Sequence, residues 1–177
     1  MLKKCTLAVF TSLMFMGMAQ AAPLLGTTAS FANSSFCKTY RCTLVARDTL
    51  SAALTEYRYA LGSACRCSST IISVLRSSNI VVSIGFVEGA QDYIFSDDPQ
   101  NQFTRQAARL VEVASGAKLN NSQLFTLNQR CQDLHNNKMN LQEARLSLAA
   151  RGKRSTVVCN LSFGEFENAW RFSLRVF

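Results

Sequence analysis

The stretch over residues 68–88 is the most apolar part of the chain beyond residue 21, and it constrains the fold more than any other feature. Its second half alternates with the period of a β-strand and places four apolar residues on one face, namely Ile80, Val82, Ile84 and Phe86. The opposite face is also largely apolar, which favours a central strand covered on part of both faces. A β-branched run over 70–76 precedes it, and Ser77, Ser78 and Asn79 favour a turn. We therefore expect a β-hairpin at the centre of a sheet.

Residues 1–21 have the pattern of a secretory signal peptide. Lys3 and Lys4 precede an apolar run over 7–18, and Ala19, Gln20 and Ala21 form a small-x-small cleavage pattern. The apolar run is shorter than the roughly 20 residues that a membrane-spanning helix needs, and no later run approaches that length. We expect residues 1–21 to be cleaved, and residues 22–177 to form a single secreted or periplasmic domain without a transmembrane segment.

The cysteines that follow the leader predict a disulfide framework, because their number is even and the chain is expected to be exported. They are Cys37, Cys42, Cys65, Cys67, Cys131 and Cys159. Cys65 and Cys67 lie two residues apart, a spacing that suits bonds to a neighbouring segment better than a bond to each other. The favoured pairing joins Cys37 and Cys42 to Cys65 and Cys67, and joins Cys131 to Cys159. A local bridge between Cys37 and Cys42 is the alternative.

Further strands are predicted wherever apolar residues alternate with polar ones, over 40–47, 55–61, 156–163 and 170–176. Residues 22–36 have no clear period, so we expect an irregular lead-in that is tied down at Cys37. Together with the central hairpin, these segments indicate a sheet of about six strands.

Helical periodicity is confined to the middle of the chain. A helix is predicted between Asp98, a good N-cap, and Gly116, which supplies a left-handed end. A second is predicted over 122–135, where leucines and Cys131 recur at intervals of three and four. Residues 140–151 are interpreted as a third helix because they contain strong helix formers and pair Asn140 with Glu143 in a capping box. Alternation of small and apolar residues makes a strand the alternative there, with Ala144, Leu146, Leu148 and Ala150 on one face.

This order of elements predicts a disulfide-stabilised α+β domain. Its mainly antiparallel sheet would have about six strands, with two or three helices inserted between strands 4 and 5.

Few residues point to catalysis. His135 is the only histidine, and its place near the end of a predicted helix explains it as a surface or capping residue. The cysteine spacings do not match those of structural zinc sites, so we expect no metal and no cofactor. Acidic residues near the sheet-to-helix crossover, Glu88, Asp92, Asp97 and Asp98, support a small secreted hydrolase as an alternative function. An inhibitor of an exported enzyme is a further alternative.

The charge of the chain favours an anionic partner, since the formal net charge is +8 and arginine predominates among the basic residues. The predicted strand faces place five arginines opposite the core, together with Thr43 and Ser173: Arg41, Arg47, Arg58, Arg171 and Arg175. Such a row suits charge-assisted contact with carboxylate or phosphate groups. We therefore expect an exported, non-catalytic binding or interaction domain that contacts an anionic polymer or another anionic component of a cell surface.

Overall fold

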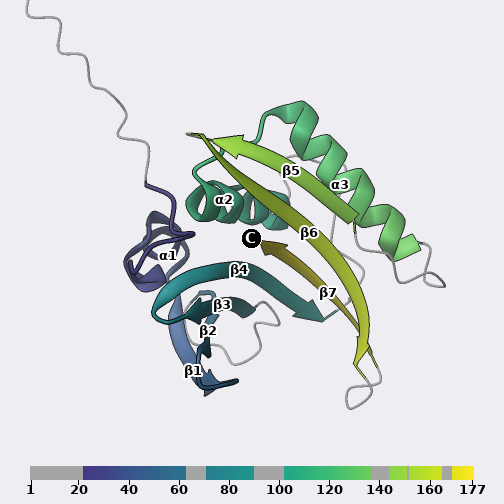
Figure 1. Cartoon of the computed structure of the whole chain (residues 1–177). Helices are drawn as coiled ribbons and strands as arrows, with labels where there is room; N and C mark the ends of the chain where they lie inside the picture. Colours follow the sequence, from purple (N-terminus) through teal and green to yellow (C-terminus); the bar gives the residue numbers. More distant parts are fainter. Residues whose placement is uncertain (1–21, 63–70, 90–101, 137–143, 151, 165–168) are drawn as a thin grey trace, which may run out of the picture.

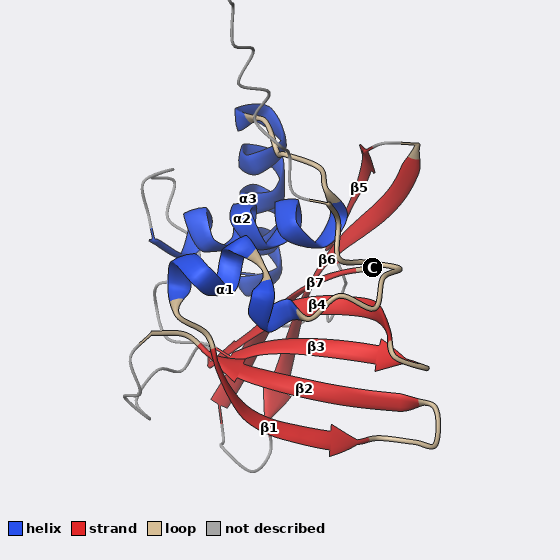
Figure 2. Ribbon diagram, turned by 90° about the vertical axis from the view of Figure 1, so that its left-hand side faces the viewer, coloured by secondary structure: helices blue, strands red, loops and turns tan. Residues whose placement is uncertain are grey.

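The described residues form one seven-stranded antiparallel sheet with three α-helices on one side, as Figure 2 shows. The computed structural model describes residues 22–62, 71–89, 102–136, 144–150, 152–164 and 169–177. The strands are β1 (Thr43–Thr49), β2 (Leu54–Ala60), β3 (Ile71–Ser77), β4 (Ile80–Gly89), β5 (Ala144–Ala150), β6 (Lys153–Gly164) and β7 (Ala169–Val176). The helices are a 3₁₀ turn, η1 (Phe31–Asn33), and α1 (Ser35–Tyr40), α2 (Gln102–Ser115) and α3 (Asn121–Asn136).

The strand order β1-β2-β3-β4-β7-β6-β5 joins two meanders along β4 and β7. Helices α2 and α3 lie in the connection between the two meanders, and the curved sheet wraps partly around α2 (Figure 1). The predicted α+β architecture, with helices inserted between the fourth and fifth strands, is confirmed. The sheet has seven strands rather than about six, because residues 144–150 form a strand and not a helix.

The central hairpin is formed by β3 and β4, as predicted, with a two-residue turn at Ser78 and Asn79. Both residues have positive φ, 48° and 69°, the backbone twist that joins antiparallel strands tightly. The predicted face of β4 is wrong at its start. Arg76 pairs with Val81 and Leu75 with Ser83, so one extra residue forms a β-bulge. The bulge buries Val81 and leaves Ile80 and Val82 exposed, while Ile84 and Phe86 face the core as expected.

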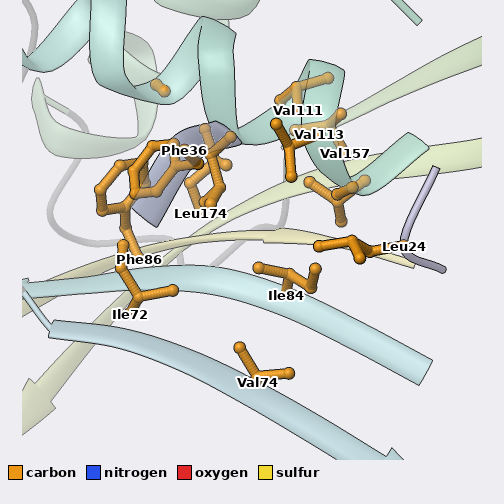
Figure 3. Packing of buried hydrophobic residues seen from close by; sticks show 14 of the residues in the cluster. Leu24, Phe36, Ile72, Val74, Ile84, Phe86, Val111, Val113, Val157 and Leu174 are labelled. Atoms are coloured by element: carbon orange, nitrogen blue, oxygen red, sulfur yellow. The ribbon is translucent and has the colours of Figure 1, made fainter. Parts of the chain in front are cut away.

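The core fills the space between the helices and the concave face of the sheet. Figure 3 shows Phe36 of α1 against Phe86 of β4 and Leu174 of β7, all fully buried. Their ring and methyl contacts combine residues from three elements that are far apart in the sequence. Burial of this kind supplies most of the free energy that stabilises a domain of this size.

Residues 22–30 contain no helix or strand, as the sequence predicts, but backbone hydrogen bonds hold this N-terminal segment against the core. The backbone N–H groups of Leu24 and Leu25 donate to the carbonyls of Val113 and Ala114 in the last turn of α2, at 3.1 and 3.0 Å. These carbonyls would otherwise have no partner within the helix. Gly26 and Thr27 then pair with the backbone of Val81 at the bulge, both at 2.9 Å. The segment thus caps the C-terminal end of α2 and also supplies backbone hydrogen bonds to the irregular start of β4.

Two helix ends are fixed by local hydrogen bonds. Helix α2 ends at Gly116, which has φ 74° and donates to the carbonyl of Glu112 at 2.8 Å, as the sequence predicts. Helix α3 begins with a reciprocal cap in which Asn120 Oδ1 accepts from the Gln123 N–H and Gln123 Oε1 accepts from the Asn120 N–H. The predicted start of the first helix, near Asp98, falls outside the described residues.

The interpretation of 140–151 as a helix is wrong for its described part, which is strand β5. Leu148 is buried and Leu146 and Ala150 pack against the core, whereas Arg145 and Ser147 are exposed. The same alternation of small and apolar residues led us to consider a strand as the alternative interpretation of this segment. Pairing with β6 and burial of one face outweigh the helix propensity of the segment. The proposed capping residues, Asn140 and Glu143, lie outside the described residues.

The described disulfides are Cys37–Cys42 and Cys131–Cys159. The second was predicted and links α3 to β6, which fastens the helical layer to the sheet. The favoured pairing of Cys37 and Cys42 with Cys65 and Cys67 is wrong. Residues 37 and 42 lie on either side of the left-handed end of α1, with Cα atoms 4.7 Å apart, so the local bridge forms instead. Cys65 and Cys67 lie outside the described residues.

Arg76 holds the N-terminal segment against the sheet. Its guanidinium donates to the carbonyls of Thr28, at 3.3 Å, of Asn79, at 3.0 Å, and of Ala29, and it lies over the Tyr57 ring.

We expect Arg76→Gln to lower the free energy of unfolding by about 1–3 kcal/mol, because three acceptors lose a charged donor. Arg47→Gln is a matched control, since Arg47 stacks on the same Tyr57 ring but has no such carbonyl partner among the described residues. This variant should lose less than about 1 kcal/mol of unfolding free energy. Urea unfolding of both variants makes the comparison, and equal losses would contradict an anchoring role for Arg76.

Candidate anion-binding face

The strand register sorts the side chains of the sheet into two faces, one toward the helices and one away from them. Tyr59, Ile72, Phe86, Leu174 and Cys159 are paired in succession across five strands and face the helices. The neighbouring row, Arg58, Ser73, Gly85, Arg175, Val158 and Arg145, therefore faces away from them. This second side is called the outer face.

Two of the five arginines selected from the sequence lie elsewhere. Arg41 is not in a strand, because it ends α1 in the left-handed conformation with φ 51°. Arg47 lies on the helix side, since a bulge between Leu44 and Ala46 shifts the register of β1. Its guanidinium carbon is 5.3 Å from the centre of the Tyr57 ring.

Arg58 is on the outer face as predicted, but neighbouring carboxylates compensate its charge. Its Nε donates to Asp48 at 3.1 Å, and Glu56 lies 3.8 Å from the same atom. Glu56 in turn accepts a hydrogen bond from the buried hydroxyl of Ser73. Asp48, Glu56 and Arg58 thus form a local ion-pair network that has little remaining attraction for an external anion.

Arg175 lies on the outer face in β7 and is half-buried. A Cβ placed on Gly85 would come within 2.7 Å of Arg175 Cγ, so the absence of a side chain at Gly85 makes room for the arginine stem. Arg171 occupies a position in the same alternation of β7, opposite Ser162 and Gly89. The sheet therefore brings positions 58, 171 and 175 to one face and separates them from Arg41 and Arg47.

Two outer-face arginines were missed by this selection. Arg145 in β5 pairs with Val158, whose other neighbour is Arg175, so that Val158 is flanked by two arginines and is 9% exposed. Arg154 in β6 pairs with Ala149, is exposed, and shares the outer alternation with Thr156. The alternating leucines of residues 144–150 were the available signal, because a strand there places Arg145 opposite the buried leucines.

The outer side of β5, β6 and β7, with Arg145, Ser147, Arg154, Thr156, Ser173 and Arg175, is called the basic face. The described residues of this part of the chain, 144–150, 152–164 and 169–177, include no aspartate or glutamate. They include five basic residues, Arg145, Lys153, Arg154, Arg171 and Arg175. Glu143, Glu165 and Glu167 flank these strands in the sequence and lie outside the described residues. Within the described strands of the basic face, no aspartate or glutamate is available to pair with Arg154 or Arg175, in contrast to Arg58.

Tyr59 lies under the N-terminal segment, near Arg76. Burial raises the pKa of its phenol above the ordinary value of 10.0; the positive charge of Arg76 opposes this shift and Tyr57 adds to it. The phenol is therefore neutral at ordinary pH, and its ring packs edge-on against Phe31 with centroids 5.3 Å apart. Its role is in the core.

The alternative hydrolase site cannot be assembled from the described residues. Asp92, Asp97 and Asp98 lie outside them, as do Glu165 and Glu167, and the side chains of Glu88 and His135 are not described. Among the residues that the structure describes, no group of three histidine, cysteine, aspartate or glutamate side chains could hold a metal ion.

Searches against protein-family models, curated proteins and solved structures found no match to this chain. Within its described part, the chain has no helix with the length and apolar character needed to cross a membrane.

Proposed function

We propose that this protein is an exported, non-catalytic binding domain that contacts anionic polymers or other anionic cell-surface material through its basic face. The observation that carries the proposal is the separation of charges on the outer side of the sheet. Arg58 is paired with Asp48 and Glu56, whereas the described strands of the basic face contain arginines and no carboxylate residue.

The chemistry of the basic face suits phosphate or carboxylate groups. Guanidinium groups donate two parallel hydrogen bonds to such anions, and the hydroxyls of Ser147, Thr156 and Ser173 can add further donors. Backbone pairing on a sheet holds the arginine positions at fixed spacing, with Arg145 and Arg175 two strands, or roughly 10 Å, apart. A repeating anion can contact several such positions at once, so its affinity gains from multivalency.

Export is supported by the disulfides and by the leader pattern of residues 1–21. Disulfides persist in oxidising compartments and are rare in the reducing cytosol. The two described disulfides fit an exported protein, and the basic face would then meet the polyanions of a cell envelope or surface.

We expect the double substitution Arg154→Gln/Arg175→Gln to weaken binding to long-chain inorganic polyphosphate. It should also reduce the slope of log affinity against log salt concentration by about 1.5, since two phosphate contacts release fewer counterions. Titration at several salt concentrations measures both effects. Polygalacturonate, titrated in parallel, shows whether carboxylates are bound as well as phosphates.

The control is Arg47→Gln/Arg58→Gln, which removes the same charge from the other half of the sheet. Its polyphosphate affinity and salt slope should remain close to those of the native protein. If the two double variants lose affinity equally, net charge alone governs binding and the basic face is not the site.

A further inference from the structure

Exposed apolar side chains gather at one end of the sheet. Among the described residues, seven large apolar side chains are exposed, and four of them, Leu50, Ile80, Val82 and Phe177, lie at or beside the β1–β2 turn, the β3–β4 turn and the end of β7. Antiparallel pairing brings these three places to the same end, which is seen at the right of Figure 2 and is called the turn end.

Hydrogen bonds hold the turn end together as one surface. The Ser78 N–H donates to the Ala53 carbonyl at 3.1 Å, which joins the two turns. Phe177 and Thr156 exchange backbone hydrogen bonds at 3.1 and 3.0 Å, which fixes the end of β7 beside β6. The pair Ile84 and Val176 places Phe177 next to the start of β4, within about two residues of Val82. Ile80, Val82 and Phe177 are therefore exposed apolar side chains at the same end of the sheet, at the start of β4 and directly after β7.

The same end carries positive charge. Lys153 and Arg154 begin β6 there, and a Cβ placed on Gly26 of the N-terminal segment would lie 3.9 Å from Lys153 Nζ. The nearest described carboxylate along these turns, Asp48, is paired with Arg58. Lysine and arginine side chains thus share this end of the sheet with exposed apolar side chains.

A surface of this composition fits an anionic lipid bilayer better than a soluble polyanion. A soluble polyanion offers nothing to an exposed phenylalanine or isoleucine, and large exposed apolar side chains of this kind mark contact sites. A bilayer surface offers phosphate headgroups to lysine and arginine and an apolar boundary just below them. A second copy of this chain would bring like charges together at the turn end, which disfavours self-association there.

We infer that the turn end docks on anionic lipid, with Lys153 and Arg154 at the headgroup phosphates and Ile80, Val82 and Phe177 entering the interface. This inference rests on the proposed function and narrows its anionic partner to a lipid surface.

The test compares vesicles of phosphatidylglycerol in phosphatidylcholine with soluble inorganic polyphosphate. Ile80→Ser/Phe177→Ser should bind the vesicles at least about ten-fold more weakly, because two apolar side chains no longer enter the interface, while polyphosphate affinity stays unchanged. Phe125→Ser is the matched control, because Phe125 is 56% exposed and belongs to α3, which contributes no residue to the turn end. It should bind vesicles like the native protein.

Three results would overturn docking on lipid: unchanged vesicle affinity of the double variant, an equal loss in Phe125→Ser, or an equal loss of vesicle and polyphosphate binding. A native dimer that the double substitution dissociates, seen by light scattering, would assign the turn end to a second copy instead. A native protein that binds polyphosphate but does not bind the phosphatidylglycerol vesicles rejects only this inference. Polyphosphate binding that is insensitive to Arg154→Gln/Arg175→Gln rejects the proposed function.

Discussion

Phe36→Ala is expected to lower the free energy of unfolding by about 3–5 kcal/mol, the range found when a buried phenylalanine is truncated and its cavity does not collapse. Phe36 is fully buried, and its ring lies 4.7 Å from that of Tyr40, 5.7 Å from Phe31 and 6.2 Å from Phe86. The substitution therefore removes contacts to α1 itself, to the N-terminal segment and to the central strand.

Equilibrium unfolding in urea measures this loss, with Phe125→Ala as the control. Phe125 is largely exposed on α3, so its truncation should change the free energy of unfolding by less than about 0.5 kcal/mol. Similar values for the two variants would mean that Phe36 does not stabilise the core, in contradiction to its complete burial.

Removal of the Cys131–Cys159 disulfide is expected to have the second largest effect. The bridge joins residues with a sequence separation of 28. By lowering the conformational entropy of the unfolded chain, it should contribute about 3.5 kcal/mol to the free energy of unfolding. The Cys37–Cys42 bridge spans only 5 residues and should contribute about 2 kcal/mol. The two bridges thus provide an internal comparison in the same protein.

The comparison uses Cys131→Ala/Cys159→Ala and Cys37→Ala/Cys42→Ala, unfolded in urea without reductant. Cys131 and Cys159 are both fully buried, so alanine introduces no polar group into the core. A larger loss from the Cys37–Cys42 pair would show that loop length does not govern the contribution of these disulfides. The first double variant should also detach α3 from β6 and expose backbone amides of α3 to hydrogen exchange earlier than those of β4.

The two meanders differ in how their charges are balanced, and this difference has a functional consequence. In β1 and β2, Asp48 and Glu56 hold Arg58 on the protein surface. Within the described strands β5 to β7, no aspartate or glutamate is available to pair with Arg154 or Arg175. The proposed contact with an anionic partner rests on this difference between the two halves of the sheet.

Much of the fold could be predicted because local patterns agree with their tertiary surroundings. The hairpin of β3 and β4, the end of α2 at Gly116 and the inward position of Cys131 all follow from spacing and turn chemistry within a few residues. Such features depend on steric and hydrogen-bonding preferences that act over one turn or one strand pair.

The candidate site was predicted only in part, because face assignments depend on register. A single extra residue in β1 places Arg47 on the helix side of the sheet. A second bulge, in β4, buries Val81 and leaves Val82 exposed. Bulges shift a side chain to the other face without changing the composition of a strand. Arg145 was missed for another reason: its segment has good helix formers, and only pairing with β6 made it a strand.

By itself, the sequence determined the α+β class, the central hairpin, the place of the helices and the Cys131–Cys159 bridge, since each depends on short-range periodicity or on the inward direction of single residues. Tertiary structure alone decided which arginines share a face and that Leu24, Phe31 and Phe36 belong to the core. These outcomes depend on contacts between segments that are distant in the chain, such as Leu24 with Val113 and Arg76 with Thr28. Local propensities do not encode such contacts, because the free energy that selects them appears only when the segments pack together.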